Sequence, residues 1–219
     1  MVNMTDFNNK AHSDNITKSI FDRQRELMSK YEGIEEANGL LETHDVPVDI
    51  DSYKGQARLK NFAWRVTEEL TEALEPVYTC PEVLKGSEEY VHMIEEYIDA
   101  VHFLAELAIL SGIDPVEDPI FNYGGIIHAT IPTFEPKHLI PNTMAVIENL
   151  GLAMNCLKNK PWKQTHVTTD EQKYKKYIVL AGRDLALTLY LQFGLQGDDL
   201  LNCYLNKADV NKFRQESGY

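Results

Sequence analysis

The sequence predicts an all-α protein in which several helices form one bundle. One predicted helix has apolar residues at the spacing of a single helix face: Leu59, Phe62, Val66, Leu70, Ala73 and Val77. Capping residues and Gly or Pro stops divide much of the remaining chain into further segments of helical length. With 219 residues the chain is long enough for one sizeable core, and nothing marks a second domain. We therefore expect a single domain over residues 1–219.

The first half of the chain is expected to form three helices. Residues 1–13 are polar and are predicted to be a mobile tail. The first helix is expected to be capped by Ser13 or Asp14 and to run through Tyr31. A loop that includes Gly33 and the stretch from Gly39 to Gly55 is expected to follow it. The second helix is expected to end between Val77 and Pro81, and the third to run from Glu88 to Ser111 and Gly112.

The second half is expected to contain one irregular segment and three more helices. Residues 113–141 are rich in Pro and Gly and are predicted to be a variable loop or lid-like segment. A short β-ribbon at residues 121–134 is the alternative prediction for part of this segment. The expected helices run from Asn142 through Lys158, from Asp170 to Gly194, and from Asp198 or Asp199 toward the C-terminus. The middle one is apolar around its second half, which indicates a central bundle helix or a subunit interface, and Gly182 within it permits close helix approach.

Four carboxylates stand in two pairs on consecutive predicted helices. Glu69 and Glu72 lie in TEELTEALE, and Glu96 and Asp99 lie in EEYIDAVHFLAELAIL. The i, i+3 spacing places both side chains of a pair on one helix face. In both helices this face leans toward apolar neighbours. Two interpretations are open: pairs on a solvated surface, or inward-facing carboxylates that converge on one object.

Inward-facing carboxylates need a partner, because burying an ionised group without compensation is costly. No Lys or Arg lies one helical turn from Glu96 or Asp99, although Arg65 precedes Glu69 by four residues. Hard divalent cations are the simplest partner, and Mg²⁺ binds readily where a few carboxylates meet substrate phosphates. We therefore predict a Mg²⁺ site formed by Glu69, Glu72, Glu96 and Asp99.

Charge and composition argue against several other classes of protein. The formal net charge is −13, which disfavours a nucleic-acid surface. The apolar stretches are too short to cross a membrane and the N-terminus has no signal-peptide core, so we expect a cytoplasmic protein that binds no membrane. Cys80, Cys156 and Cys203 lack the spacing of zinc ligands. Neither a Walker loop nor a GxSxG motif is present.

Three polar residues form a stripe on the last predicted helix. Lys207, Asn211 and Arg214 are spaced i, i+4 and i+7, and therefore share one helix face. A solvated basic edge is one interpretation of this stripe. The other is a set of directional donors for the oxygens of a metal-bound triphosphate.

These segments resemble a known family. EELTEAL followed by EEYIDAVHFLAELA resembles the ExxE and ExxD helices of the all-α nucleoside triphosphate pyrophosphatases, which include MazG-type enzymes and dimeric dUTPases. NKADVNKFRQESGY resembles the K-x-x-x-N-x-x-R-Q-x-x-G-Y signature of dimeric dUTPases and of related phage dCTP/dUTP pyrophosphatases. The resemblance implies a homodimeric helical bundle of this type. The chain ends on this Gly-Tyr pair, as some phage members do, so we expect a virus-encoded enzyme acting in the host cytoplasm.

The resemblance also implies roles for individual residues. Gln24 and Leu27 resemble a Q-x-x-L motif whose glutamine contacts the base, and an exposed glutamine is the alternative. Met28 stands where family dUTPases usually have Asn, which leaves cytosine open as the base. The residues expected at the phosphates are Lys207, Arg214 and Tyr219, with Asn211 at the phosphates or the sugar.

Together these features predict a Mg²⁺-dependent enzyme that hydrolyses dUTP, and dCTP as a further substrate, to the monophosphate and pyrophosphate. Glu69 or Glu72 is expected to orient the attacking water and to accept its proton. Two alternatives stay open. One is a pyrophosphatase of the same fold that prefers dCTP or a modified nucleotide, and the other is a non-catalytic helical regulator.

Overall fold

The predicted all-α class is confirmed by the computed structural model, which describes residues 4–39, 41–80, 82–121, 133–160 and 162–217. Every regular element within these ranges is helical. The elements are η1 (Met4–Asp6), α1 (Ile16–Ala37), α2 (Tyr53–Thr79), α3 (Glu88–Leu110), α4 (Pro136–Cys156), α5 (Glu171–Thr188), η2 (Leu189–Phe193) and α6 (Gly197–Glu216).

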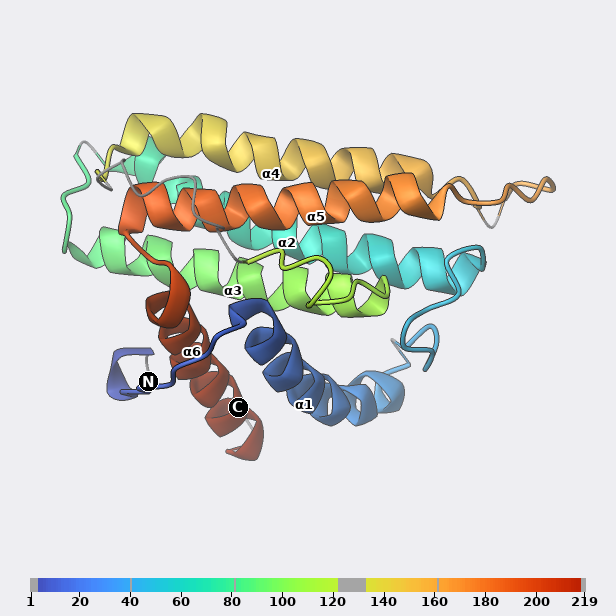
Figure 1. Cartoon of the computed structure of the whole chain (residues 1–219), viewed down its shortest axis with the longest axis horizontal. Coiled ribbons are helices and arrows are strands. Elements are labelled where there is room, and N and C mark those ends of the chain that lie inside the picture. Colours follow the sequence, from blue (N-terminus) through green and yellow to red (C-terminus); the bar gives the residue numbers. More distant parts are fainter. Residues whose placement is uncertain (1–3, 40, 81, 122–132, 161, 218–219) are drawn as a thin grey trace.

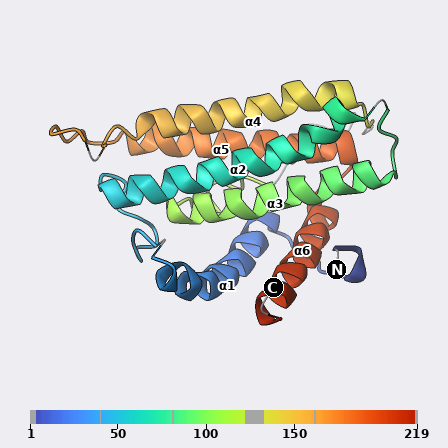
Figure 2. The same ribbon diagram turned by 180° about the vertical axis from the view of Figure 1, so that it is seen from behind.

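Four long helices run side by side, and two more lie across one side of them. In Figures 1 and 2, α2, α3, α4 and α5 form the layered bundle, in which α2 packs on α3 and α4 packs on α5. Helices α1 and α6 lie beyond α3, on the side away from α4, and contact α3 and each other. Helix α3 therefore has the bundle core on one side and the α1–α6 pair on another.

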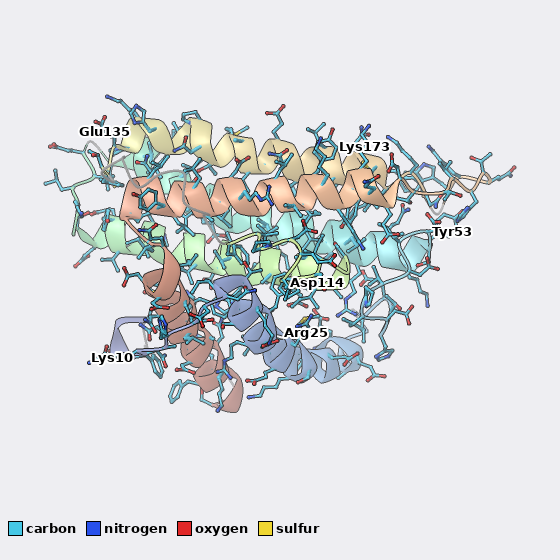
Figure 3. All side chains as sticks on the ribbon, viewed as in Figure 1. Lys10, Arg25, Tyr53, Asp114, Glu135 and Lys173 are labelled. Carbon is cyan, nitrogen blue, oxygen red and sulfur yellow. The ribbon has the colours of Figure 1, made fainter. Side chains whose placement is uncertain are left out.

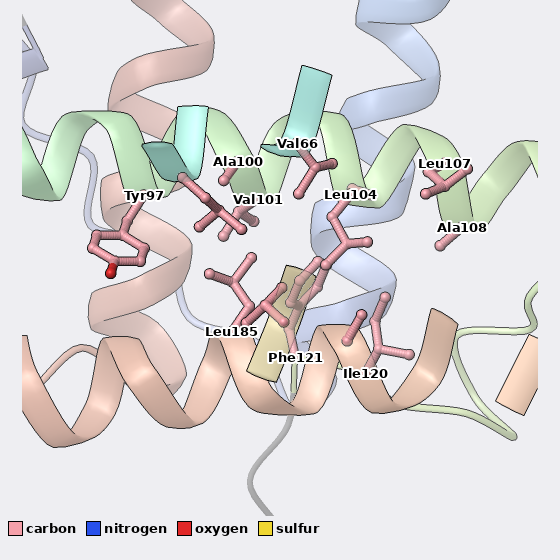
Figure 4. Close-up of a cluster of buried hydrophobic side chains, with 14 of the residues drawn as sticks. Val66, Tyr97, Ala100, Val101, Leu104, Leu107, Ala108, Ile120, Phe121 and Leu185 are labelled. Atoms are coloured by element: carbon pink, nitrogen blue, oxygen red, sulfur yellow. The ribbon is translucent and has the colours of Figure 1, made fainter. Parts of the chain in front are cut away.

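One cluster of the buried core lies between α3 and α5. Figure 4 shows Tyr97, Val101 and Leu104 of α3 directed toward Leu185 of α5, with Val66 of α2 close by. All five side chains are fully buried. Burying a side chain as large as leucine contributes about 2 kcal/mol relative to leaving it in water. Apolar burial therefore holds α3 in place as the central helix.

The ends of α2, α3 and α5 follow the expected signals. Helix α2 ends at Thr79, inside the predicted interval. Helix α3 begins after Ser87, whose Oγ accepts a hydrogen bond from the Tyr90 amide, and it ends at Leu110. Helix α5 begins after Asp170, whose carboxylate accepts a hydrogen bond from the Lys173 amide. These caps satisfy amide groups that have no partner within the helix.

The predicted limits of α1 and α4 were wrong. Helix α1 is capped by Asn15 rather than Ser13 or Asp14, and it continues through Gly33 to Ala37. Helix α4 begins at Pro136 rather than after Asn142. Proline is compatible with a first helical turn because the amide hydrogen it lacks has no intrahelical partner there. The second proline, Pro141, lies within the helix and does not stop it.

Gly182 permits a close approach, but of a loop residue rather than of another helix. A Cβ atom at Gly182 would lie 2.8 Å from Cβ of Ile120, which belongs to the segment after α3. Ile120 is fully buried and appears beside α5 in Figure 4. Most of the β-ribbon considered at residues 121–134 falls on residues 122–132, outside the described ranges. The expected lid-like role of residues 113–141 stays a prediction.

The N-terminal segment lies along α6. The Ala11 amide donates to Asn202 Oδ1 at 2.7 Å, and the Ser13 amide donates to Asp198 Oδ1 at 3.1 Å. Figure 3 shows the neighbouring Lys10 beside α6. Residues expected to form a mobile tail therefore have hydrogen-bond partners on this helix.

The C-terminal helices are joined by a sharp bend. Gly194 has a φ of 75° and ends η2, and the α5–η2 segment meets α6 at 100°. No single helix in the described ranges is long and apolar enough to cross a membrane. The bent pair Glu171–Phe193 and Gly197–Arg214 meets that test only when its two parts are taken together. The bend directs α6 across α3, where it reaches the candidate site.

Candidate active site

Three of the four predicted carboxylates lie together between α2 and α3. Oxygens of Glu69 and Glu72 on α2 and of Glu96 on α3 all lie within 4.8 Å of one another. Glu69 and Glu96 are half-buried, whereas Glu72 is exposed. Nδ1 of His92 lies 3.1 Å from Oε1 of Glu96. Oxygen ligands from two helices are therefore close enough to hold one cation.

Glu69 is strongly affected by this crowding. Burial raises the pKa of Glu69 from 4.5 to about 8, with further contributions from a hydrogen bond with Glu96 and from the negative charges of Asp99, Glu96 and Glu72. At neutral pH and without a cation, Glu69 is therefore protonated. A cation would displace this proton, because its charge offsets the repulsion among the carboxylates.

Asp99 lies near this cluster but has a basic partner. Its Oδ2 lies 2.7 Å from Nζ of Lys207 on α6. Burial raises the pKa of Asp99 to about 6, and the charge and hydrogen bond of Lys207 act in the opposite direction. The sequence shows no cation one turn away on the same helix, and the structure supplies one from the last helix. Direct metal coordination by Asp99 stays a prediction.

A cavity of about 220 Å³, partly open to solvent, lies between α1, α2, α3 and α6. The lining residues are Gln24, Leu27, Tyr31, Glu35, Phe62, Arg65, Glu69, Asp99, His102, Phe103, Glu106 and Asn211. The rings of Phe62 and Phe103 have centroids 6.4 Å apart, and the Arg65 guanidinium lies over both. Aromatic walls beside a few convergent polar groups are typical of a pocket for a small organic ligand.

The polar stripe of α6 faces this site. Lys207 pairs with Asp99 and its side chain is only 7 % exposed, which excludes a solvated basic edge at this position. Asn211 lines the cavity, and the charge of Arg214 lowers the pKa of Asp99. Tyr219 lies outside the described residues. The structure therefore brings three of the four predicted C-terminal residues near Asp99 or the cavity.

Gln24 lies at the other end of the cavity and is only 3 % exposed, so the alternative of an exposed glutamine is wrong. Its Nε2 donates to Glu106 Oε2 at 2.9 Å. Its Oε1 accepts from the Tyr204 hydroxyl at 2.7 Å and lies 3.0 Å from Nδ1 of His102. The rings of His102 and Tyr204 are stacked. Three side chains from two other helices therefore hold the Gln24 amide in one orientation.

His102, Glu106 and Tyr204 were not among the predicted site residues. His102 and Glu106 follow Asp99 at i+3 and i+7, and therefore lie on the same face of α3. Their role in the site was not predicted because the surrounding run, AVHFLAELAIL, is apolar on almost every face and indicates a buried core helix. The detectable signal was a histidine and a glutamate continuing the face of a predicted metal ligand into an apolar stretch.

Fold and site together define an all-α protein in which carboxylates of α2 and α3, and Lys207 and Asn211 of α6, lie at an aromatic cavity. A scan against protein-family models matches residues 82–219 to a family described as dUTPase. This range covers more than half of the chain, so the protein belongs to the dUTPase-like family of all-α nucleoside triphosphate pyrophosphatases. A search of curated proteins and a search of solved structures each found no match.

The matched range contains α3 to α6 and therefore includes Glu96, Asp99 and Lys207. Helices α1 and α2 precede it. Glu69 and Glu72 consequently enter the site through their position beside Glu96, and not through the family match. The geometry thus adds a second acidic helix to the part of the site that the family match covers.

Proposed function

We propose that this protein is a Mg²⁺-dependent pyrophosphatase that hydrolyses a pyrimidine deoxynucleoside triphosphate, dUTP or dCTP, to the monophosphate and pyrophosphate. The observation that carries the proposal is the convergence of Glu69, Glu72 and Glu96 beside an aromatic cavity. The family supplies the reaction class, and the acidic cluster supplies a place for the metal and the phosphates.

The ligand set fits Mg²⁺. This ion takes oxygen ligands, keeps some of its waters, and binds through a few carboxylates together with substrate phosphates. The cluster offers three carboxylates, and the exposed Glu72 leaves one side open to water and phosphate. Burial raises the pKa of Glu69 most, and the hydrogen bond with Glu96 and the negative charges of Asp99, Glu96 and Glu72 raise it further, which a bound cation would offset. Glu69, Glu72 and Glu96 would hold Mg²⁺, which would offset the negative charge of the phosphates and lower the pKa of a water molecule.

The protein's own residues account for the movement of the proton. Glu69 or Glu72 orients a water molecule and accepts its proton while the water oxygen attacks the α-phosphorus. The bond between the α-phosphorus and the bridging oxygen breaks, and pyrophosphate leaves with the electron pair of that bond. Positioning by two rigid helices favours this step, because the reacting atoms need little further ordering.

The remaining groups hold the substrate. Arg214 and Asn211 would donate hydrogen bonds to phosphate or sugar oxygens, and charge-assisted bonds of this kind are short and strong. Lys207 fixes Asp99 and adds positive charge at the phosphate end. Phe62 and Phe103 offer apolar ring faces between this end and Gln24. A nucleotide would therefore lie with its phosphates at the acidic cluster and its base toward Gln24.

Product analysis tests this proposal. The purified protein is incubated with Mg²⁺ and, separately, with dUTP, dCTP, dTTP, dATP and dGTP, and a matched series contains EDTA. We expect the monophosphate and pyrophosphate in equal amounts from dUTP, dCTP or both, and none in EDTA. Release of inorganic phosphate as the first product would contradict attack on the α-phosphorus. Failure to cleave any triphosphate would favour the non-catalytic regulator.

A further inference from the structure

The Gln24 end of the cavity, formed by Gln24, His102, Glu106 and Tyr204, has a fixed pattern of hydrogen-bond donors and acceptors. Tyr204 donates its hydroxyl hydrogen to Gln24 Oε1, and Gln24 Nε2 donates to Glu106. The Gln24 carbonyl oxygen can only accept, so the proton of His102 is on Nδ1, which faces that oxygen. Nε2 of His102 is therefore an acceptor.

This acceptor has no protein partner. Nε2 of His102 is buried and makes no hydrogen bond within the described residues. Burial lowers the pKa of His102 to about 3, so the ring is neutral and Nε2 keeps its lone pair. A buried acceptor without a donor is unfavourable. Because His102 lines the cavity, a ligand that brings a donor would satisfy it.

Glu106 adds a second acceptor at the same end. It is 6 % exposed, lines the cavity, and receives one hydrogen bond, from Gln24, among the contacts between described side chains. Burial is the main cause that raises the pKa of Glu106 to about 7. The hydrogen bond from Gln24 lowers this pKa, the charge of Glu35 raises it, and the charges of Arg58 and Arg65 lower it. Above this pKa the side chain is a carboxylate and can only accept hydrogen bonds.

The spacing along α3 places Glu106 where a base edge would lie. Glu106 is seven residues after Asp99, which is two helical turns or about 10 Å along the axis. Phe103 lines the cavity between them. If the phosphates lie at the Asp99 end, the edge of the base farthest from the sugar faces Glu106 and His102.

At position 4 of the ring, cytosine carries a hydrogen-bond donor and uracil carries an acceptor. Cytosine presents an amino group with two hydrogens at position 4, whereas the uracil-type ring presents a carbonyl oxygen there. A carboxylate accepts well from the cytosine amino group, but it leaves a carbonyl oxygen without a donor. We infer that Glu106, supported by His102, makes this site selective for a 4-aminopyrimidine nucleotide, so that dCTP is preferred over dUTP. This inference rests on the proposed function and specifies its substrate.

A competition assay tests the inference. Equal concentrations of dCTP and dUTP are mixed with enzyme and Mg²⁺ at pH 8, and the initial yields of dCMP and dUMP give the ratio of the two kcat/KM values. We expect dCMP to exceed dUMP by roughly 10-fold or more, the effect of one hydrogen bond to a charged group. Glu106→Gln, which can donate its amide hydrogens to a carbonyl oxygen, should lower or invert this ratio. Glu88→Gln, the same change at an exposed position of α3, should leave it unaltered.

The outcomes separate the inference from the proposed function. A wild-type ratio near one or in favour of dUTP, or a ratio that Glu106→Gln leaves unchanged, would overturn the selectivity while the enzyme stands. If neither triphosphate is cleaved, the proposed function fails. Thermal unfolding of the wild-type protein with dCMP or dUMP then tests the pocket without hydrolysis and without a variant. A larger increase in Tm with dCMP supports the inference, and an equal or smaller increase overturns it.

Discussion

Glu69→Gln is expected to lower kcat/KM for triphosphate hydrolysis by about 100- to 10,000-fold, the range for removal of a general base. The substitution also removes one of the three carboxylates that would hold the metal. The fold should be retained, because the glutamine side chain has nearly the shape of the protonated carboxyl that burial and neighbouring charges favour at neutral pH. Steady-state kinetics with Mg²⁺ measure the loss of kcat/KM, and thermal unfolding in EDTA tests whether the fold is retained.

The control for this variant is Glu75→Gln. Glu75 lies on the same helix as Glu69 but is exposed and is not part of the acidic cluster. It should have wild-type kinetics. Unchanged hydrolysis in Glu69→Gln would show that the site is elsewhere. A large loss of Tm in EDTA would contradict the view that Glu69 is protonated in the metal-free protein.

Lys207→Met is expected to lower the free energy of unfolding by about 3 kcal/mol at pH 8 in EDTA, the lower end for breaking a buried ion pair. Lys207 and Asp99 are both largely shielded from water, so removing the lysine leaves a carboxylate without its basic partner. Urea denaturation measures the loss. Lys18→Met, which breaks an exposed Lys–Asp pair on α1, should cost only about 0.5 kcal/mol.

The loss in Lys207→Met should depend on pH. The pKa of Asp99 is raised from 3.8 in the unfolded chain to about 6 in the folded protein. Protonation of Asp99 therefore stabilises the fold fully below about pH 3.8, and this stabilisation is lost as the pH rises through 6. Lys207 lowers this pKa, and without it the pKa rises further. The deficit should therefore be larger at pH 8 than at pH 5. Adding Asp99→Asn should recover part of it at pH 8, and a deficit that is the same at both pH values would contradict this explanation.

Local signals in the sequence were sufficient for much of the fold. The apolar face of α2, the predicted helix start at Glu88 and the cap Asp170 depend on residues within a few positions of one another, so the sequence pattern there reflects the structure directly. The limits of α1 and α4 failed for the opposite reason. Gly33 and Pro141 usually interrupt helices, but both are incorporated into longer ones, and propensity is a weak constraint once a helix is packed on its neighbours.

The candidate site divides in the same way. The i, i+3 pairs identified Glu69, Glu72 and Glu96 because their spacing is a local property of each helix. The partner of Asp99 could not be found locally, because Lys207 reaches it from the last helix. The network of Gln24 with Glu106 and Tyr204 likewise joins three helices. Contacts between distant helices depend on tertiary packing, which no spacing within one helix encodes.

The most direct test of the central claim is to locate a metal ion and a nucleotide in the same crystal. Mn²⁺ replaces Mg²⁺ in oxygen sites and can be located by its anomalous scattering, and a triphosphate with a non-hydrolysable α–β bridge prevents turnover. We predict Mn²⁺ at about 2.1 Å from carboxylate oxygens of Glu69, Glu72 and Glu96, with the triphosphate bound to the same ion. Mn²⁺ bound elsewhere, or a nucleotide outside the cavity between α1, α2, α3 and α6, would contradict the proposed site.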